Sequence, residues 1–469
     1  MPVCHSGAQA HWPAAAAGEP AERALRLAGT VIARIEVRAE RAAATVPRGD
    51  ERRPFDWAGG RRASSLADGF GGLALLNLYA ARAGIQELSA ASRYVREAVA
   101  ATRLHPFTGS GLFAGTSGLA MVIADCAQDE PRFRPMLERL HTRLAEQVLG
   151  SLPPRDPGRV RTRHFDLAGG AAGTLCHLSS MEEPDDTSRT AAQALADYLI
   201  WLSTPPAAPD APPRWLVTPD RCPPGASLAA RYPHGHLDCG LAHGAPGVAV
   251  ALAAAWQAGH RRPGHLQALR GLTSWLRAAA DDGEGPVWPA ALPAHRDAGP
   301  RAFRSDRAGP REPGVIGETP PGPAVPDQER PGWCYGSAGV SAALRTAADA
   351  LDDDALRQFA VSGFEAALRR TRLRRVTTPV LCHGLAGLLM ICLDFAAVSE
   401  AARGAVPHLV TELLARADPE RPFLFADRSP SSDPDDGPGL LTGAAGVVLA
   451  LLAATGDRRP RWFHAFLGR

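Results

Sequence analysis

Two cysteine-containing stretches of this chain carry residue types that bind metal ions. Cys334 stands in GWCYGSAG (332–339), and Cys382 and His383 stand in LCHGLAGL (381–388). Cysteine thiolates and imidazole nitrogens are preferred zinc ligands, and a site with three protein ligands keeps a fourth position open for a reactant. A thiol bound there loses its proton and becomes a nucleophile near neutral pH. The two stretches therefore predict a catalytic zinc site, against the alternative of three unrelated core residues.

Both stretches belong to a repeated motif. A Gly-x-x-Gly followed by an apolar run occurs seven times, beginning at Gly69, Gly115, Gly170, Gly244, Gly336, Gly384 and Gly443. Each apolar run predicts a helix that is buried on every side. An amphipathic segment precedes each motif, at 21–42, 89–103, 132–152, 187–203, 264–280, 353–371 and 401–416. The chain therefore alternates an outer helix, a glycine loop and an inner helix.

Such helix pairs are not stable singly, because their apolar inner members must bury one another. Seven pairs can close into a ring, so we expect an all-α fold: an α/α toroid of seven outer and seven inner helices. Each glycine loop leads from an outer to an inner helix, which places all seven loops at one end of the ring. In most copies the glycines serve turns and close packing only. At this end, residues far apart in the sequence can converge.

Polar residues are concentrated in copies three to six of the motif. Copy three reads RHFDLAGG and contains Asp166, while copy four reads HLDCGLAHG and contains His243. Copy five adds Tyr335 directly after its cysteine, with Arg330 just upstream. Other polar residues near these motifs are interpreted as structural or as part of the rim of the site: His164, His234, His236 and Cys239.

In combination, GWCYGSAGV, CHGLAG, LAHGAPG and FDLAGGAAG resemble the motifs of the lanthionine synthetase C-like family, the lanthipeptide cyclases. The resemblance extends over most of the chain, from about residue 60 to about residue 455, with the motifs in the correct order. It implies a double ring of seven outer and seven inner helices. It also implies one zinc ion per chain, bound by Cys334, Cys382 and His383.

The resemblance further implies a site for closing thioether rings in a dehydrated lanthipeptide precursor, consisting of leader and core. A zinc-bound cysteine thiolate of the peptide adds to the β-carbon of dehydroalanine or dehydrobutyrine. Arg330 holds the developing negative charge, and His243 supplies a proton while Asp166 orients it or takes the thiol proton. Tyr335 belongs to the same site. Each residue also has a plainer interpretation: Asp166 as a helix N-cap, His243 as a core histidine, Tyr335 as a packing residue and Arg330 as a loop residue.

The composition of the chain gives no support to nucleic-acid binding, membrane association or secretion. The formal net charge is only +2, so neither nucleic-acid binding nor a membrane-surface role has electrostatic support. The sequence contains neither a long apolar run nor the basic start and apolar stretch of a signal peptide. We therefore expect a cytoplasmic protein without direct membrane insertion, whose eight cysteines remain thiols.

The glycine spacing predicts one toroid domain at 19–460, with a flexible N-terminus at 1–18 and a C-terminal tail at 461–469. Two Pro/Gly-rich insertions, at about 203–235 and 283–331, precede copies four and five.

The first insertion contains RWLVT (214–218), the one strand-like piece, which leaves open a small β insertion. We hypothesise that both insertions contact the precursor peptide, because loops beside an active end suit this role. The Asp/Pro-rich segment 427–439 is also expected to be flexible.

Three interpretations compete for the whole chain. In the first, the chain is an enzyme that resembles the stand-alone cyclases. Such a cyclase works with a separate dehydratase, and an exporter is a further possible partner. The second is a non-catalytic relative that binds zinc and thiol peptides or glutathione. The third is a protein prenyltransferase subunit, another zinc-containing α/α ring, whose zinc motifs differ from those here. The pair of Asp166 and His243 favours an enzyme, because a binding protein needs no acid–base pair.

Overall fold

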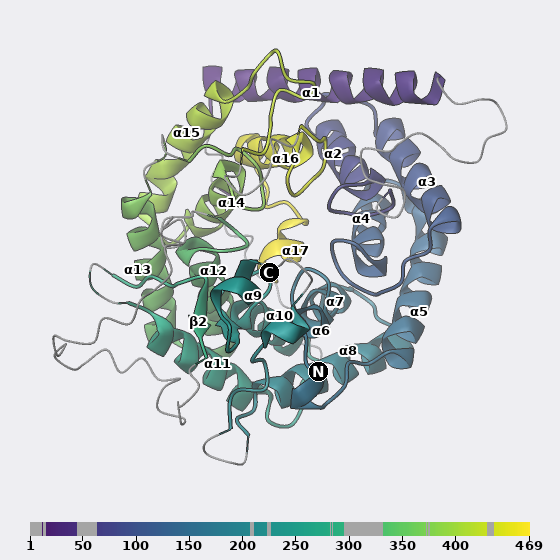
Figure 1. Ribbon diagram of the computed structural model, residues 1–469. Helices are drawn as coiled ribbons and strands as arrows, with labels where there is room; N and C mark the ends of the chain where they lie inside the picture. The colour runs from purple at the N-terminus through teal and green to yellow at the C-terminus, as the bar shows by residue number, and fades with distance from the viewer. Residues whose placement is uncertain are drawn as a thin grey trace, which may run out of the picture.

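The structure, a computed structural model, describes residues 12, 16–44, 63–206, 211–222, 227–281, 283, 285–294, 332–371, 373, 376–428 and 436–469. Its helices form a closed α/α toroid (Figure 1), which confirms the predicted fold class. The outer helices are α1 (Glu19–Ala44), α3 (Leu88–Leu104), α5 (Arg134–Gly150), α8 (Asp186–Ser203), α11 (His265–Ala279), α13 (Asp354–Arg370) and α15 (Glu400–Ala415). The inner helices are α2 (Phe70–Arg82), α4 (Thr116–Asp129), α7 (Ala171–Ser179), α10 (Ala245–Gln257), α12 (Ser337–Leu351), α14 (Leu385–Phe395) and α16 (Ala444–Thr455).

Burial distinguishes the two layers as their sequences require. Every residue of α14 is buried, because this helix contacts neighbours on all sides of the inner layer. In the outer helix α11, by contrast, burial recurs every three or four residues, at Ala268, Leu269, Leu272 and Leu276. The outer helices therefore bury one stripe against the inner layer and expose the other to solvent.

The second glycine of each motif is required by close packing within its own loop. A Cβ atom at this position would overlap the carbonyl oxygen of the residue six positions earlier, for example Leu112 for Gly118 and Leu381 for Gly387. That earlier residue is leucine in six copies and Trp333 in copy five. Its own side chain packs against the second glycine of the next copy, as Leu66 does against Gly118. The contact repeats around the ring, and Leu440 of copy seven packs against Gly72 of copy one.

A closed ring of backbone hydrogen bonds joins the seven loops. The residue two positions before each motif glycine donates its N–H to the carbonyl oxygen of the corresponding residue in the next copy. These bonds, of 2.9–3.2 Å, run in order through Ala67, Phe113, Ala168, Ala242, Cys334, Cys382 and Leu441, and return to Ala67. We call these residues the loop ring. The loop ring fixes the seven loops in one register at one end of the toroid.

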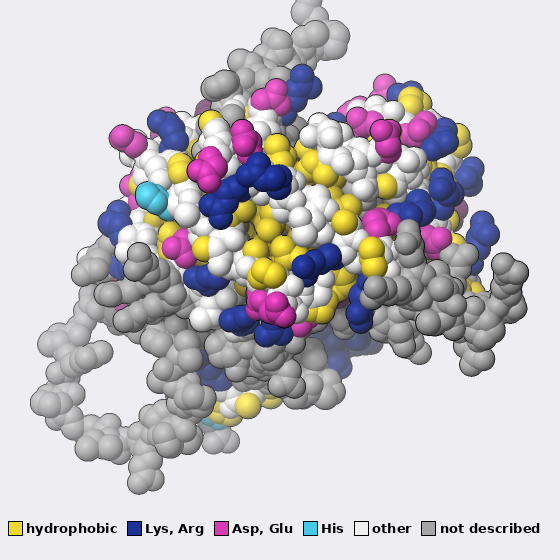
Figure 2. All heavy atoms as spheres, turned by 90° about the horizontal axis from the view of Figure 1, so that it is seen from above, with side chains coloured by type: hydrophobic (Ala, Val, Ile, Leu, Met, Phe, Trp, Pro, Cys, Tyr) yellow, Lys and Arg dark blue, Asp and Glu magenta, His cyan; other side chains and the backbone are white. Residues whose placement is uncertain are grey.

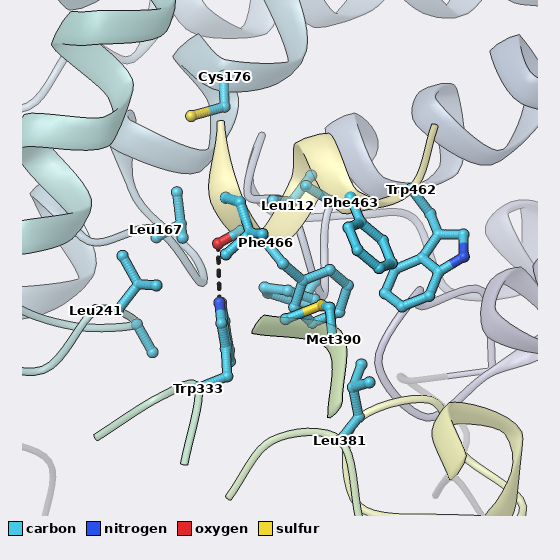
Figure 3. Close-up of a cluster of buried hydrophobic side chains, with 14 of the residues drawn as sticks. Leu112, Leu167, Cys176, Leu241, Trp333, Leu381, Met390, Trp462, Phe463 and Phe466 are labelled. Atoms are coloured by element: carbon cyan, nitrogen blue, oxygen red, sulfur yellow. Dashed lines mark hydrogen bonds between the residues drawn. The ribbon is translucent and has the colours of Figure 1, made fainter. Parts of the chain in front are cut away.

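The C-terminal residues lie inside the toroid, so residues 461–469 are not a tail. The short helix α17 (Phe463–Leu467) lies at the centre of the ring (Figure 1). The carbonyl oxygen of Phe466 accepts a hydrogen bond of 2.8 Å from Nε1 of Trp333, and their rings lie 4.9 Å apart (Figure 3). Phe466 also contacts Phe113 of the loop ring. The end of the chain is thus a core element because aromatic side chains fill the space within the ring.

The described part of the N-terminal region is also anchored. Trp12 is buried and donates from Nε1 to the carbonyl oxygen of Ala453, at 3.1 Å. The backbone N–H of Ala16 donates to Ala454. The flexibility expected for 1–18 does not apply to these two residues, and most of that segment lies outside the described residues.

A small antiparallel pair of strands follows the first insertion and includes part of the second. Strand β1 (His236–Asp238) pairs with β2 (Ala291–Pro293), and Val217 forms a single bridge to His236. The strand-like piece 214–218 is therefore only a bridge partner, and both strands lie elsewhere. Two short α-helices also lie in the loops, α6 (Thr162–Phe165) before α7 and α9 (Ser227–Arg231) before β1. Most of the second insertion, 295–331, lies outside the described residues, so its expected peptide contacts stay a prediction.

Two surface properties bear on the excluded functions. Among the helices that the structure describes, none has both the length and the apolar character to cross a bilayer. On the face seen in Figure 2, arginines and acidic side chains are interspersed with hydrophobic ones.

We predict that Gly118→Ala destabilises the protein, because the new Cβ would overlap the carbonyl oxygen of Leu112. Overpacking of this kind costs about 3 kcal/mol. The matched control is Gly271→Ala in α11, where a Cβ meets no atom within 4 Å. This control should stabilise by about 0.5–1 kcal/mol through helix propensity. Urea denaturation measures both changes, and equal midpoints for the two variants would contradict the packing role of the motif glycines.

Candidate metal centre and adjoining acid–base residues

The loop ring brings the three expected metal-binding residues together. Cys334 and Cys382 occupy equivalent positions in consecutive copies, and the N–H of Cys334 donates to the carbonyl oxygen of Cys382 at 3.0 Å. His383 follows Cys382 directly. The two Sγ atoms and one imidazole nitrogen all lie within 4.8 Å of one another. Cys334 is buried, while Cys382 and His383 are partly exposed, so the cluster is open to solvent on one side.

The two thiols perturb each other's pKa in this geometry. A hydrogen bond from Cys382, with further contributions from His383, lowers the pKa of Cys334 below its ordinary value, against the opposing effect of burial. The same hydrogen bond raises the pKa of Cys382 well above its ordinary value. A metal ion bound here would hold both cysteines as thiolates, since the metal-binding form of cysteine is the thiolate.

An aspartate missed by sequence reasoning fixes the orientation of His383. Asp427 accepts from Nε2 of His383, with its two carboxylate oxygens at 2.9 and 3.1 Å. Thr378 holds the same carboxylate through a hydrogen bond of 2.9 Å. The imidazole therefore has Nδ1 left for a metal, with the carboxylate–histidine arrangement typical of metal sites. Asp427 is only 5% exposed, which corrects its assignment to the flexible segment 427–439.

A histidine–aspartate pair lies beside the cysteines. Nδ1 of His243 lies 2.7 Å from Oδ2 of Asp166, and Oδ1 of Asp166 accepts from the N–H of Gly169 at 2.9 Å. Asp166 follows the last residue of α6 and is not an N-cap, so it shapes its loop and also orients the imidazole. Burial disfavours a charged imidazole, but the hydrogen bond to Asp166 and the nearby negative charges of Asp166 and Asp238 outweigh it. They raise the pKa of His243 to about 9.

A second aspartate that sequence reasoning did not select holds Tyr335. The tyrosine hydroxyl donates to Oδ2 of Asp238 at 2.8 Å, and Oδ1 accepts from the N–H of Gly240 at 2.7 Å. Burial raises the pKa of Asp238 to about 6, against lowering by His243 and these hydrogen bonds. The tyrosine ring lies 6.0 Å from that of His243. Tyr335 is thus fixed between Asp238 and His243 at the edge of the site.

The residue immediately before each motif glycine lines the surface above the loop ring. These seven residues are all partly or fully exposed, although their neighbours on both sides are mostly buried: Asp68, Ala114, Gly169, His243, Tyr335, His383 and Thr442. Consecutive copies four to six place His243, Tyr335 and His383 along one arc. Copies two and three place only Ala114 and Gly169 there, so the site has a polar arc and an arc with small side chains.

The remaining expected residues have simpler positions. Arg330 lies outside the described residues, so its place in the site stays a prediction. His236 is buried in β1, and Cys239 is buried directly after this strand. Nδ1 of His164 accepts the N–H of Arg161 within the turn of α6. His234 is an exposed residue of the turn before β1.

Comparison with known proteins assigns the family. The family model described as "Lanthionine synthetase C-like protein" matches residues 62–467, so the chain belongs to this family. A curated relative, the "Nisin biosynthesis protein NisC" of Lactococcus lactis subsp. lactis, is 24% identical over 294 residues. The aligned part spans 61% of this chain and 62% of that relative, slightly less than two thirds of its length.

The fold also matches a solved structure. The structure titled "Nisin cyclase" superimposes with a TM-score of 0.72 and 20% sequence identity, over 92% of this chain and 97% of that chain. At this identity the match establishes the shared toroid, including the double layer of helices described above.

We predict that Asp166→Asn lowers the pKa of His243 from about 9 toward the ordinary 6.5, because the carboxylate no longer stabilises the charged imidazole. An NMR titration of the His243 ring resonances measures this. The control Asp156→Asn removes a carboxylate that accepts from Gly158 instead, and it should leave the His243 titration unchanged. A pKa near 9 in Asp166→Asn would contradict the pairing.

Proposed function

We propose that this member of the lanthionine synthetase C-like family is a zinc-dependent lanthipeptide cyclase. It adds cysteine thiols of a dehydrated precursor peptide to dehydroalanine or dehydrobutyrine, forming (methyl)lanthionine rings. The observation that carries the proposal is the convergence of Cys334, Cys382 and His383 within 4.8 Å, beside the His243–Asp166 pair. The names of the relative and of the solved structure, which refer to nisin biosynthesis and cyclisation, support it.

The residues present fit one zinc ion per chain. Cys334, Cys382 and His383 offer two sulfur atoms and one nitrogen atom, and the hydrogen bond from His383 to Asp427 leaves Nδ1 available. Three protein ligands leave one coordination position for a peptide cysteine. When bound, zinc supplies a thiolate nucleophile at neutral pH.

His243 and Asp166 carry out the acid–base step. The peptide thiol gives up one proton to solvent. Addition of the thiolate sulfur to the β-carbon then forms one C–S bond, breaks the Cα–Cβ π bond and leaves an enolate, which takes one proton at the α-carbon. Because Nδ1 of His243 is held by Asp166, Nε2 is the nitrogen that can deliver this proton. The raised pKa of His243 keeps its imidazole protonated at neutral pH. Arg330 is the proposed group for the enolate oxygen, with Tyr335 beside it.

The small arc at Ala114 and Gly169 provides room for the electrophile. Gly169 lies three residues after Asp166 in the same loop. A Cβ at Gly169 would meet only Oδ1 of Asp166 within 4 Å, at 3.8 Å. A dehydrated residue placed on this arc would face His243 of the next copy. The metal-binding residues would then approach it from the opposite arc.

The proposal includes partners consistent with this chemistry. The substrate is a dehydrated precursor of leader and core, which requires a separate dehydratase acting first and allows an exporter acting afterwards. All of these steps are proposed to take place in the cytoplasm. Nucleic acid has no role in the reaction.

The test is a cyclisation assay with a dehydrated peptide that contains one cysteine and one dehydroalanine. Ring closure does not change the peptide mass, so the readout is loss of thiol alkylation by N-ethylmaleimide. His243→Gln should slow closure by about 10²–10⁴-fold without loss of zinc, because it removes the proton donor. The exposed residue His408 provides the matched control, and His408→Gln should react like wild type.

Two outcomes would count against the enzyme. Wild-type protein with full zinc that does not exceed the uncatalysed rate would reject the cyclase. Peptide binding without turnover would instead favour a zinc- and thiol-binding protein, or a glutathione-binding one. Equal rates for His243→Gln and His408→Gln would reject only the role of His243.

We also predict that Asp427→Asn weakens zinc binding by about 10–100-fold, because the carboxylate no longer fixes the ring of His383. Competition with a chromophoric chelator measures the affinity. The control is Asp436→Asn in the same segment, since Asp436 pairs with Arg421 instead. Equal zinc affinities for the two variants would show that Asp427 does not position the ligand.

A further inference from the structure

The loop between α5 and α7 presents a group of arginines at the loop end of the toroid, beside the proposed cyclase site. Four of them are exposed residues of this loop: Arg155, Arg159, Arg161 and Arg163. The last of the four lies three residues before Asp166. A fifth, Arg221 of the first insertion, is joined to the loop because its Nη1 donates to the carbonyl oxygen of Pro157 at 2.9 Å. We call these five arginines the basic rim.

The backbone that carries the basic rim is held in place by its own contacts. Val160 and Phe165 are buried in the core. Oδ1 of Asp156 accepts from the N–H of Gly158 at 2.9 Å, and the carbonyl oxygen of Thr162 accepts from the N–H of Asp166 at 3.0 Å. The arginines therefore extend from a fixed backbone, which lowers the entropy cost of binding a partner.

Acidic groups do not balance this positive charge. The two segments that carry the basic rim, 155–163 and 219–222, contain Asp156 and Asp220 as their acidic residues, so five arginines stand against two carboxylates. Arg221 pairs with Asp220 at 3.8 Å, and among the described residues the other four arginines have no ion-pair partner. The formal net charge of the whole chain is only +2, so the excess is local.

The charges of the basic rim act together at one place close to the site. His164 is partly buried, and burial lowers its pKa. The positive charges of Arg163, Arg161 and Arg159 lower this pKa further. Their fields therefore overlap two residues before Asp166, where all three attract a negatively charged ligand.

The same end of the toroid exposes apolar side chains. Each outer helix leads into a glycine loop, so the C-terminal ends of α3 and α5 lie at the loop end. Leu104 at the end of α3 is 48% exposed, and Leu149 and Leu152 at the end of α5 are 38% and 44% exposed. They are three of the five large apolar residues that the described part of the chain exposes. A partner of the basic rim thus meets apolar contacts as well.

These features suit an acidic peptide better than nucleic acid. The planar fork of arginine binds a carboxylate through two parallel hydrogen bonds. Single-stranded nucleic acid is held by aromatic side chains that stack on its bases, in addition to basic ones. The segment 151–164 contains no Phe, Tyr or Trp, and Trp215 of the first insertion is buried.

We propose that the basic rim binds an acidic segment of the same precursor peptide whose ring is closed at the cysteine site. This inference rests on the proposed cyclase function and assigns a recognition surface to its substrate. Copy three places Gly169 on the arc with small side chains, so a peptide whose dehydrated residue lies there can extend across the basic rim. Its carboxylates would pair with the arginines, and apolar residues between them would contact Leu149 and Leu152.

The test measures binding of two labelled peptides to the purified full-length chain by fluorescence anisotropy. One peptide alternates Asp with Leu, the other has Asn in place of Asp, and neither contains cysteine or a dehydrated residue. Wild type should bind the acidic peptide more tightly than the neutral one, with an affinity that falls as salt rises. Arg161→Gln/Arg163→Gln should weaken binding of the acidic peptide by about 5–20-fold, since each exposed ion pair contributes modestly. The matched control Arg139→Gln/Arg143→Gln removes two exposed arginines of α5 and should bind like wild type.

A second readout joins the acidic segment to a peptide with one cysteine and one dehydroalanine. Arg161→Gln/Arg163→Gln should then raise the KM for ring closure without changing kcat, because the basic rim binds the peptide away from the reacting atoms. Without the acidic segment, this variant and wild type should close the ring at equal rates.

Equal affinity of wild type for the acidic and the neutral peptide would overturn the proposal. An equal loss of affinity in Arg139→Gln/Arg143→Gln would overturn it as well, because the attraction would then come from the surface in general. Tighter binding of a single-stranded oligonucleotide at the same arginines would reject the peptide as the partner. Wild type that binds the acidic peptide through the basic rim but closes no ring would support the acidic-peptide surface and reject only the cyclase, so the two proposals fail separately.

Discussion

The structure depends on the closure of seven loops into one ring of backbone hydrogen bonds. Each loop donates one N–H to the next, and the bond from Leu441 back to Ala67 closes the cycle. Four of the seven ring residues are buried and three are partly buried, and an unpaired buried backbone group would cost about 1–3 kcal/mol. The motif glycines make the closure possible because any Cβ at their second position would overlap the loop that precedes it. A repeat that cannot bury its inner helix alone is thus stabilised by its neighbours on both sides.

The same constraint explains why the site lies where it does. Residues at equivalent positions of consecutive repeats become spatial neighbours, so Cys334 and Cys382, which are 48 residues apart in the sequence, are joined by one hydrogen bond. The residue after each ring position points to the surface above it, which brings His243, Tyr335 and His383 onto one arc. Trp333, directly before Cys334, connects this arc to the C-terminal helix α17 through Phe466. The end of the chain therefore stabilises the metal-binding loop through this contact.

Much of this arrangement could be predicted from the sequence, because it follows from periodicity. Seven copies of one motif set the number of helices, and their connectivity placed all glycine loops at one end of the ring. The residues that escaped prediction are those whose contacts the repeat does not determine. Asp427 lies in a segment rich in Asp and Pro, where no pattern distinguishes it from its neighbours, and only the tertiary fold brings it to His383. Asp238 lies in copy four, five residues before His243, but nothing in the sequence indicated its bond to Tyr335, and α17 is too short to show periodicity.

The most direct test of the account is X-ray absorption at the zinc edge of the purified protein. The account predicts two sulfur atoms at about 2.3 Å and two lighter atoms at about 2.0–2.1 Å, one of them an imidazole nitrogen. Replacing either Cys334 or Cys382 by alanine should remove one sulfur from this shell or release the metal. A shell of four sulfur atoms, or one with oxygen and nitrogen alone, would contradict the claim that the loop ring assembles one open metal site from copies five and six.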